Sequence, residues 1–167
     1  EAFAKIYDYL VNPLYKYIFY RVNSTEDAQD LLETLFLKVW ENIRGYKCDK
    51  NSFSAWVFRI AHNLIVDYYR LSKDKFTEEL SMHIQDHDRR HNPIKSTQQV
   101  LDQKLLKLAI AKLKKKYRDI IIYKFINELS NQEISDILGK NEGNLRILQF
   151  RALKALKKEL NDMGVSY

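Results

Sequence analysis

Cysteine, glycine and proline are scarce in this sequence, which has one, four and two of them among 167 residues. A single cysteine, Cys48, excludes a disulfide within the chain and is typical of a reducing compartment. Scarce glycine and proline disfavour turn-rich β architectures and favour helices. No hydrophobic run approaches the roughly 20 residues needed to cross a bilayer, and no signal peptide is evident. We therefore expect an all-α protein of the cytoplasm without direct membrane insertion.

Charge of both signs is plentiful, but the excess of +6 is confined to one end of the chain. Residues 1–71 hold nine basic and nine acidic residues, and residues 72–101 hold five of each. Residues 102–167 hold fourteen basic and eight acidic residues, so this segment carries the whole excess. A localised basic region suggests a polyanionic partner such as nucleic acid, although a solvated lysine-rich surface fits the charge equally well.

Two helices are predicted in the first 43 residues. Residues 2–22 have a helical pattern, and Asn12-Pro13 predicts an interruption because proline suits the first turn of a new helix. Ser24 is the expected N-cap of a second helix that stops at Gly45. Its apolar residues follow the three-four spacing of one buried face. They are Ala28, Leu31, Leu32, Leu35, Phe36, Val39, Trp40 and Ile43.

A third helix is predicted after the polar loop 46–51, with Ser52 as its cap. Its apolar residues again recur at helical spacing and predict a second buried face. They are Phe53, Trp56, Val57, Ile60, Ala61, Leu64, Ile65 and Tyr68. Phe58 and Tyr69 lie off this stripe, among Arg59, His62 and Asn63, and the pattern does not decide whether those two rings are buried.

Residues 72–100 are mostly polar, are interrupted by Pro93 and lack apolar periodicity, so we interpret them as a linker. Helical patterning returns near Leu101 and continues to Leu160. Within the linker His83, His87 and His91 recur every four residues, a spacing that could bind zinc on a helix. Because the helical pattern is weakest there, we expect no metal site and no cofactor. Glycine-rich phosphate loops, zincin motifs and nucleophile elbows are also missing, which argues against an enzyme.

The segment from Leu129 to Leu156 has the pattern of a helix-turn-helix. Ser130 and Glu133 form a capping box, Gly139 ends a short helix, and a longer basic helix starts near Glu142. The expected inward side chains of the longer helix are Leu145, Leu148, Ala152, Leu153 and Leu156.

In a helix-turn-helix, the second helix enters the major groove with its N-terminal residues at the base edges. Asn144 and Arg146 are of the types that read adenine and guanine. Lys140, Arg151 and Lys154 are better placed for phosphates. An ordinary helical hairpin is the plainer alternative, but the caps, the glycine and the charge together favour DNA binding.

The order of three stretches resembles that of a bacterial sigma factor of the extracytoplasmic-function group (ECF, group IV). The stretches are EDAQDLLETLFLKVWENI (26–43), FSAWVFRIAHNLIVDYYR (53–70) and the helix-turn-helix ending RALKAL. The resemblance covers residues 3–71 and 101–160. It implies region 2 at 1–71, a linker at 72–100 and region 4 at 101–167. Such a factor binds core RNA polymerase, opens the −10 promoter element and holds the −35 element as duplex, without being an enzyme.

The resemblance also assigns residues to three contact sites. Contacts to single-stranded −10 DNA fall on Lys47, Asn51, Ser52, Phe53, Trp56, Arg59, His62, Asn63 and Arg70. Contacts to the −35 duplex fall on Lys140, Asn141, Glu142, Asn144, Arg146, Phe150, Arg151 and Lys154. Contacts to core polymerase fall on Asp27, Asp30, Thr34, Lys38 and Glu41. The family usually has glutamine where this chain has Glu33 or Thr34, so LLETLF departs from its pattern.

Beyond polymerase and promoter DNA, the resemblance implies an anti-sigma factor, which often holds members of this family inactive. Two other functions remain open at this point. A stand-alone helix-turn-helix regulator would bind its DNA site without polymerase. A helical metal-dependent enzyme would use the histidine-rich segment and require a metal.

Overall fold

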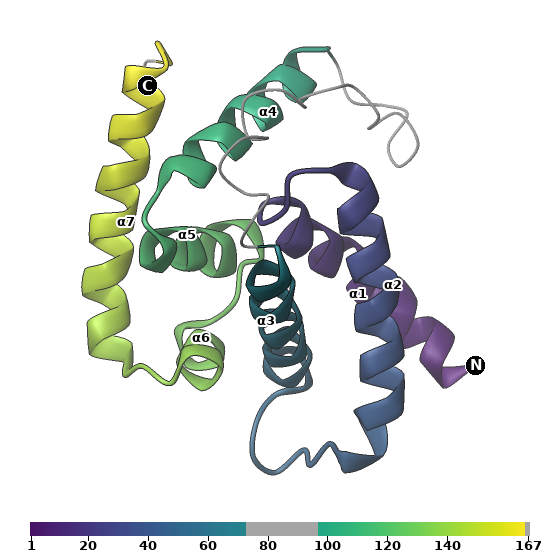
Figure 1. The fold of residues 1–167 in the computed structure, drawn as a ribbon. Helices are drawn as coiled ribbons and strands as arrows, with labels where there is room; N and C mark the ends of the chain where they lie inside the picture. The colour runs from purple at the N-terminus through teal and green to yellow at the C-terminus, as the bar shows by residue number, and fades with distance from the viewer. Residues whose placement is uncertain (73–96, 166–167) are drawn as a thin grey trace. The chain divides into compact units, whose positions relative to one another are not determined.

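A computed structural model of the chain describes residues 1–72 and 97–165, which are helical and contain no strand (Figure 1). Contacts divide the chain into two compact units. The first contains α1 to α3, and the second contains α4, α5, most of α6, and α7. The all-α fold with two helical parts is therefore confirmed.

No helix within the described ranges combines the length and apolar character needed to span a membrane. The predicted metal candidates His83, His87 and His91 lie outside the described residues.

Helix α1 (Ala2–Phe19) runs without a break through Pro13, so the predicted interruption at Asn12-Pro13 is wrong. A proline inside a helix costs about 3 kcal/mol, because one backbone hydrogen bond is lost and the ring crowds the preceding turn. Leu10 and Leu14 lie on either side of Pro13 and are at most 2% exposed. Burying each leucine contributes about 1.5–3 kcal/mol. Packing on both sides of the proline thus offsets its cost and keeps one helix.

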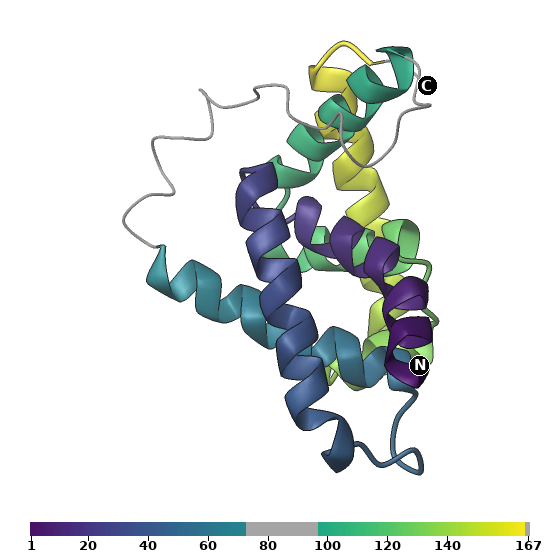
Figure 2. The ribbon, with the colours of Figure 1, turned by 90° about the vertical axis from the view of Figure 1, so that its right-hand side faces the viewer.

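Helices α2 (Thr25–Asn42) and α3 (Phe53–Leu71) begin at the two predicted serine caps. The backbone N–H of Asp27 donates to Oγ of Ser24 over 3.0 Å, and that of Ala55 donates to Oγ of Ser52 over 3.1 Å. A 3-10 turn, η1 (Ile43–Gly45), follows α2. Helix α2 packs against both α1 and α3 (Figures 1 and 2). The hydroxyl of Tyr68 on α3 also donates to Oδ2 of Asp27 on α2 over 2.8 Å.

The structure decides one aromatic position that periodicity left open and corrects another. Phe58, off the predicted stripe, is 2% exposed, and its ring meets Tyr17 of α1 edge-on at 5.5 Å between centroids. Helix α3 contacts both α1 and α2, so it is buried over a wider arc than one stripe. Trp40, on the predicted inward face of α2, is 57% exposed and touches Phe3 edge-on at 4.7 Å. It lies near the end of α2, where its ring meets Phe3 from the start of α1.

The second unit is built around the packing of α7 (Glu142–Asp162) on α4 (Thr97–Lys112) and α5 (Lys115–Ile121). The guanidinium of Arg118 on α5 donates to the carbonyl oxygens of Ile110, Ala111 and Leu113 at 3.4, 2.8 and 3.2 Å. It thereby supplies donors at the C-terminal end of α4, where the last carbonyl groups of a helix lack partners within it. A π-helical turn, η2 (Ile122–Ile126), and α6 (Asn131–Leu138) complete the unit. Helix α4 includes residues 97–100, the last four residues of the expected linker of 72–100.

Replacing Tyr68 by phenylalanine removes the hydroxyl that joins α3 to Asp27 and leaves the ring in place. A hydrogen bond to a charged acceptor contributes about 1–2 kcal/mol where it is partly buried, so we expect the first unit to lose about that much free energy of unfolding. Both tryptophans of the chain, Trp40 and Trp56, lie in this unit, so urea unfolding followed by tryptophan fluorescence reports on it within the whole chain. Tyr9→Phe, at a side chain 73% exposed, is the matched control and should change stability little.

Candidate nucleic-acid interface

The short helix α6 begins with the predicted capping box, and both of its hydrogen bonds are present. The N–H of Glu133 donates to Oγ of Ser130 over 3.1 Å, and the N–H of Ser130 donates to Oε2 of Glu133 over 2.9 Å. Two of the unpaired donors at the helix start are thus satisfied by side chains. Ile134 of α6 is fully buried.

The turn between α6 and α7 depends on Gly139, whose φ of +66° lies in the left-handed region that favours glycine. The hydroxyl of Ser135 on α6 donates to the carbonyl of Lys140 beyond the turn. Asn141 then caps α7, because its Oδ1 accepts a hydrogen bond of 2.8 Å from the N–H of Asn144. The position and direction of the second helix are therefore set within three residues of Gly139.

Helix α7 is held by buried apolar residues and by one hydrogen bond between amide side chains. Leu145 and Ala152 are fully buried. Nε2 of Gln149 donates to Oδ1 of Asn131 at the start of α6 over 2.7 Å, in a partly buried position. This bond ties the two helices of the motif together, and sequence reasoning did not identify it. Leu153 was expected to face inward but is 44% exposed, because it lies to one side of the arc centred on Leu145 and Ala152.

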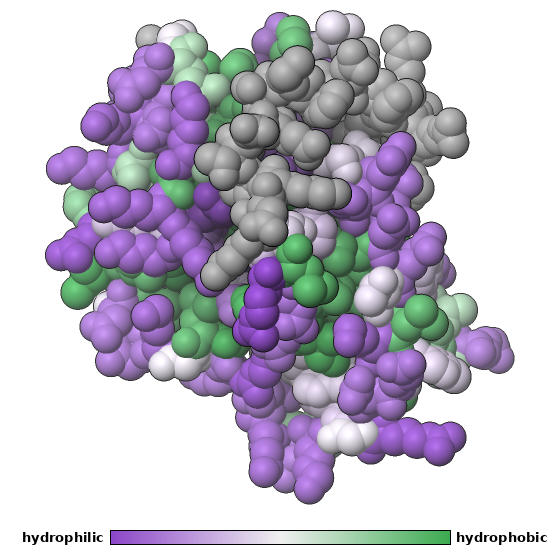
Figure 3. Space-filling view, in the orientation of Figure 1, coloured by the Kyte–Doolittle hydropathy of each residue, from purple (hydrophilic) through white to green (hydrophobic). Residues whose placement is uncertain are grey.

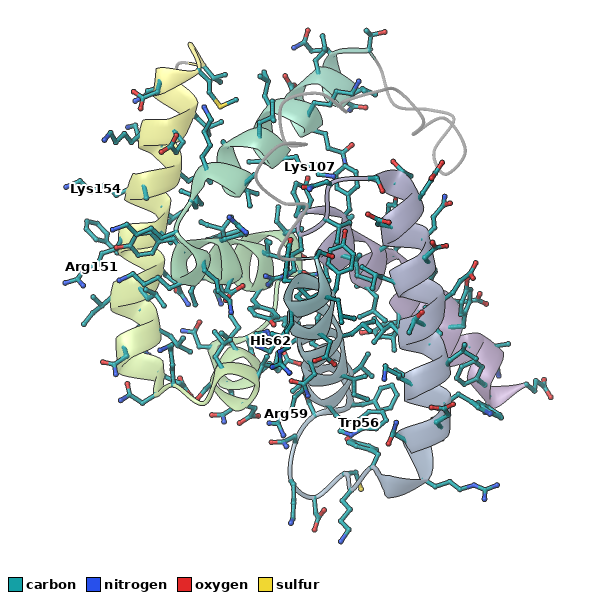
Figure 4. The ribbon with its side chains drawn as sticks, viewed as in Figure 1. Trp56, Arg59, His62, Lys107, Arg151 and Lys154 are labelled. Carbon is teal, nitrogen blue, oxygen red and sulfur yellow. The ribbon has the colours of Figure 1, made fainter. Side chains whose placement is uncertain are left out.

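The outer side of α7 carries the predicted −35 contacts. Of these, Glu142 is half-buried and the others are exposed: Lys140, Asn141, Asn144, Arg146, Phe150, Arg151 and Lys154. Arg151 and Lys154 point away from α5 (Figure 4). In Figure 3, hydrophilic side chains dominate the left edge of the view, where α7 lies, and hydrophobic side chains lie among them. Ile147, which sequence reasoning did not select, is 55% exposed on the same helix.

The predicted −10 region contains a cluster of three aromatic rings. Tyr46, Phe53 and Trp56 are half-buried, and their ring centroids lie 5.2–5.6 Å apart. The hydroxyl of Tyr46 donates to the carbonyl of Asn51 over 2.9 Å, which folds the loop 46–51 back on itself. Sequence reasoning selected Phe53 and Trp56 but missed Tyr46. The signal for it was an aromatic residue at the first position of an otherwise polar loop.

The remaining predicted −10 residues are distributed along this loop and α3. Lys47, Ser52, Asn63 and Arg70 are exposed, and Asn51, Arg59 and His62 are half-buried. Trp56, Arg59 and His62 follow one another along α3 at intervals of three residues (Figure 4). The polar loop 46–51, the aromatic cluster of Tyr46, Phe53 and Trp56, and the side chains of Arg59 and His62 thus follow one another along the loop and α3.

The predicted polymerase-binding side of α2 is mixed rather than polar. Asp30, Thr34 and Glu41 are exposed and Lys38 is half-buried. Asp27 is half-buried and accepts from Tyr68. Sequence reasoning missed two exposed apolar side chains of this helix, Leu37 at 63% and Trp40 at 57%. The sequence signal for Leu37 was an apolar residue that does not fit the three-four spacing of the buried residues of α2.

Among residues 1–72 and 97–165, no group of three or more histidine, cysteine or acidic side chains is placed to hold a metal ion. Cys48 is a free, exposed thiol in the loop 46–51. The two predicted DNA-binding surfaces, on α7 and on the loop 46–51 with α3, carry basic, amide and aromatic side chains, which are groups that bind nucleic acid.

Two family matches cover most of the chain. Residues 6–74 match Sigma-70 region 2, and residues 103–156 match Sigma-70 region 4. The chain thus has, in order, the polymerase-associated and helix-turn-helix regions of a sigma-70 protein, a class of transcription initiation factors.

Relatives refine this class. The ECF RNA polymerase sigma factor SigW of Bacillus subtilis is 31% identical over 98% of this chain and 91% of its own length. BldN of Streptomyces coelicolor, also an ECF sigma factor, is 29% identical over 97% of this chain, which spans 61% of the BldN protein. The chain therefore belongs to the ECF RNA polymerase sigma factors.

Solved structures of low sequence identity share the fold. RpoE of Bartonella quintana, solved with the anti-sigma factor NepR, has a TM-score of 0.75 at 19% identity, over 96% of this chain and 97% of that one. CnrH, solved with the cytosolic domain of CnrY, has a TM-score of 0.73 at 20% identity, over 96% and 88%. These similarities support the helical architecture.

Gly139→Ala and Gly143→Ala should have opposite effects on the stability of the helix-turn-helix. No described atom lies within 4 Å of a Cβ added at Gly139, so the cost there comes from the left-handed backbone alone and should be about 1 kcal/mol. Gly143 lies in the first turn of α7, and its added Cβ would meet only Oδ1 of Asn141 at 3.5 Å. Alanine there should raise stability by about 0.5–1 kcal/mol. Urea unfolding followed by far-ultraviolet circular dichroism measures both, and a stabilising Gly139→Ala would contradict the assigned turn.

Proposed function

We propose that this chain acts in the cytoplasm as a group IV sigma factor, which binds core RNA polymerase, directs it to promoters and catalyses no reaction. The observation that carries the proposal is the presence of two different candidate DNA surfaces in one chain. One is a helix-turn-helix suited to duplex DNA, and the other is an aromatic cluster beside a polar loop, suited to unpaired bases. The proposed domains are residues 1–71, a linker of 72–100 and residues 101–167.

The second unit would hold the −35 element as duplex. Asn144 and Arg146 lie in the first turns of α7, where a recognition helix meets base edges. Oδ1 of Asn141 is occupied by the cap, so its amide group is the part that can donate to DNA. Lys140, Arg151 and Lys154 are exposed cations that would neutralise phosphates and set the register on the duplex.

The first unit would capture the opened −10 element. Phe53 and Trp56 are only half-buried, so each leaves ring surface for a base, and a stacked base contributes about 1–3 kcal/mol. Lys47, Asn51 and Ser52 supply charge and hydrogen bonds in the adjoining loop. Tyr46 would act through the others, because its ring supports Phe53 and Trp56 and its hydroxyl holds the loop. Arg59, His62, Asn63 and Arg70 would follow the strand along α3.

Core polymerase would bind the outer side of α2. Asp30, Thr34, Lys38 and Glu41 provide the polar part of this surface, and Leu37 and Trp40 add an apolar part along one side of it. Buried apolar and aromatic side chains carry much of the energy of protein interfaces, and charged groups at the rim contribute less. Asp27 would contribute mainly by holding α2 to α3 through Tyr68.

An anti-sigma factor is a further proposed partner. Two proteins that share this fold were solved bound to a regulator: RpoE in complex with the anti-sigma factor NepR, and CnrH in complex with the cytosolic domain of CnrY. Such a partner would keep the chain from core polymerase until a signal releases it.

The proposal is tested by run-off transcription with purified core polymerase on a library of promoter-like fragments, with and without the chain. We expect specific start sites only when the chain is present. Permanganate reactivity of unpaired thymines on the same fragments should show that the −10 segment is open. With Phe53→Ala, core binding should persist and thymine reactivity should fall, because the base-stacking surface is smaller.

A different outcome would point to the stand-alone regulator. In that case the chain alone would shift a DNA site, core polymerase would not bind it, and no new start sites would appear. Phe53→Ala would then have no effect on thymine reactivity, because there would be no opened strand to hold.

Leu37→Glu should weaken the binding of core polymerase at least tenfold, since it places a charge in the proposed apolar contact. The fold should tolerate the change because Leu37 is 63% exposed. Leu71→Glu is the matched control, as the same substitution at a side chain 89% exposed on α3. Affinities can be measured by fluorescence anisotropy of labelled chain titrated with core enzyme. Equal affinities for the two variants would exclude Leu37 from the interface.

A further inference from the structure

Two large apolar side chains lie on the outer face of the recognition helix α7. Ile147 is 55% exposed and Phe150 is 71% exposed. At 100° per residue, they lie about 60° apart around the helix, and the buried Leu145 and Ala152 lie roughly 150° away. They therefore point away from the core of their own unit, on the side expected to meet DNA.

Cations surround this apolar pair. Arg146 and Arg151 fall on either side of the arc that Ile147 and Phe150 define, and Lys154 follows within it one turn later. All three basic side chains are exposed. A partner of this face must therefore be negatively charged at its edges and apolar at its centre.

Duplex DNA has this distribution of chemistry in its major groove. Phosphates line both rims, and the C5-methyl group of thymine is the apolar group displayed on the floor. From Ile147 to Phe150 the helix rises by about 4.5 Å, close to the spacing of about 3.4 Å between base pairs. The two side chains are thus spaced to reach neighbouring pairs.

We propose that Ile147 and Phe150 read thymine methyl groups in the −35 element, so that the element has thymine at the one or two positions facing them. The inference rests on the proposed function of the second unit as the −35 reader, and it adds to that function a specified chemical target. Arg151 and Lys154 then position the helix over those pairs, and the methyl contacts add to the base readout by Asn144 and Arg146.

The experiment removes only the methyl group. A −35 element is first selected from random duplexes by the full chain bound to core polymerase. Each thymine is then replaced singly by deoxyuridine, and the affinity of the same complex is measured. Burial of one methyl group is worth about 0.8 kcal/mol, so we expect roughly fourfold weaker binding at one or two positions. Deoxyuridine outside the element should have no effect.

Protein variants identify the reader. With Ile147→Ser or Phe150→Ser, one of the sensitive positions should bind thymine and uracil equally. Leu101→Ser is the matched control, since Leu101 is 49% exposed on α4 of the same unit, and it should leave the difference intact. Arg151→Ala should weaken binding to both DNAs alike, as expected for a phosphate contact.

The outcomes separate the two proposals. If no −35 element can be selected, the proposed function of the second unit fails. If an element is selected but thymine and uracil bind equally at every position, the methyl-reading inference is overturned and the −35 function stands. The inference is also overturned if the methyl effect survives in both serine variants, because another residue then reads the methyl group.

Discussion

The unpaired N–H groups at the start of each helix are the constraint on which both candidate DNA surfaces depend. The first four N–H groups of a helix have no acceptor within it, and in this chain a side chain accepts from one of them at the start of each of α2, α3, α6 and α7. The cap at Ser52 fixes where the polar loop ends and where α3 begins, at Phe53. The cap at Asn141 fixes where the turn ends and α7 begins. Both surfaces are thus located at a capped helix start, so small local bonds decide where the reading residues lie.

Much of this arrangement could be predicted from the sequence, because caps and helical periodicity are local. Ser24, Ser52, Ser130 and Gly139 each have the predicted role. What periodicity could not show is how many neighbours a helix has. Phe58 lies off the stripe of α3 and is buried because α1 covers a second side of that helix.

Tertiary contacts also account for the other differences. Pro13 is accommodated because the leucines on both sides of it are buried. Trp40 and Leu153 have the spacing of core residues but lie at the edges of the covered arcs. Tyr46 and Gln149 act through partners five and eighteen residues away, and no single-helix pattern reveals such pairs. For the candidate site, the sequence predicted the elements, the charged side chains and three of the aromatic ones. The structure added the exposed Leu37, Trp40 and Ile147 and the supporting Tyr46 and Gln149.

The amide pair of Gln149 and Asn131 has a consequence for how binding responds to ionic strength. The bond that holds α7 to α6 joins two uncharged groups, so dissolved salt does not screen it as it screens contacts between cations and phosphates. Raising the salt concentration should therefore weaken the proposed contacts of α7 with DNA while this bond between the two helices persists. The motif can leave one site and meet another without being rebuilt, which suits a protein that must search many sequences before it stops at one.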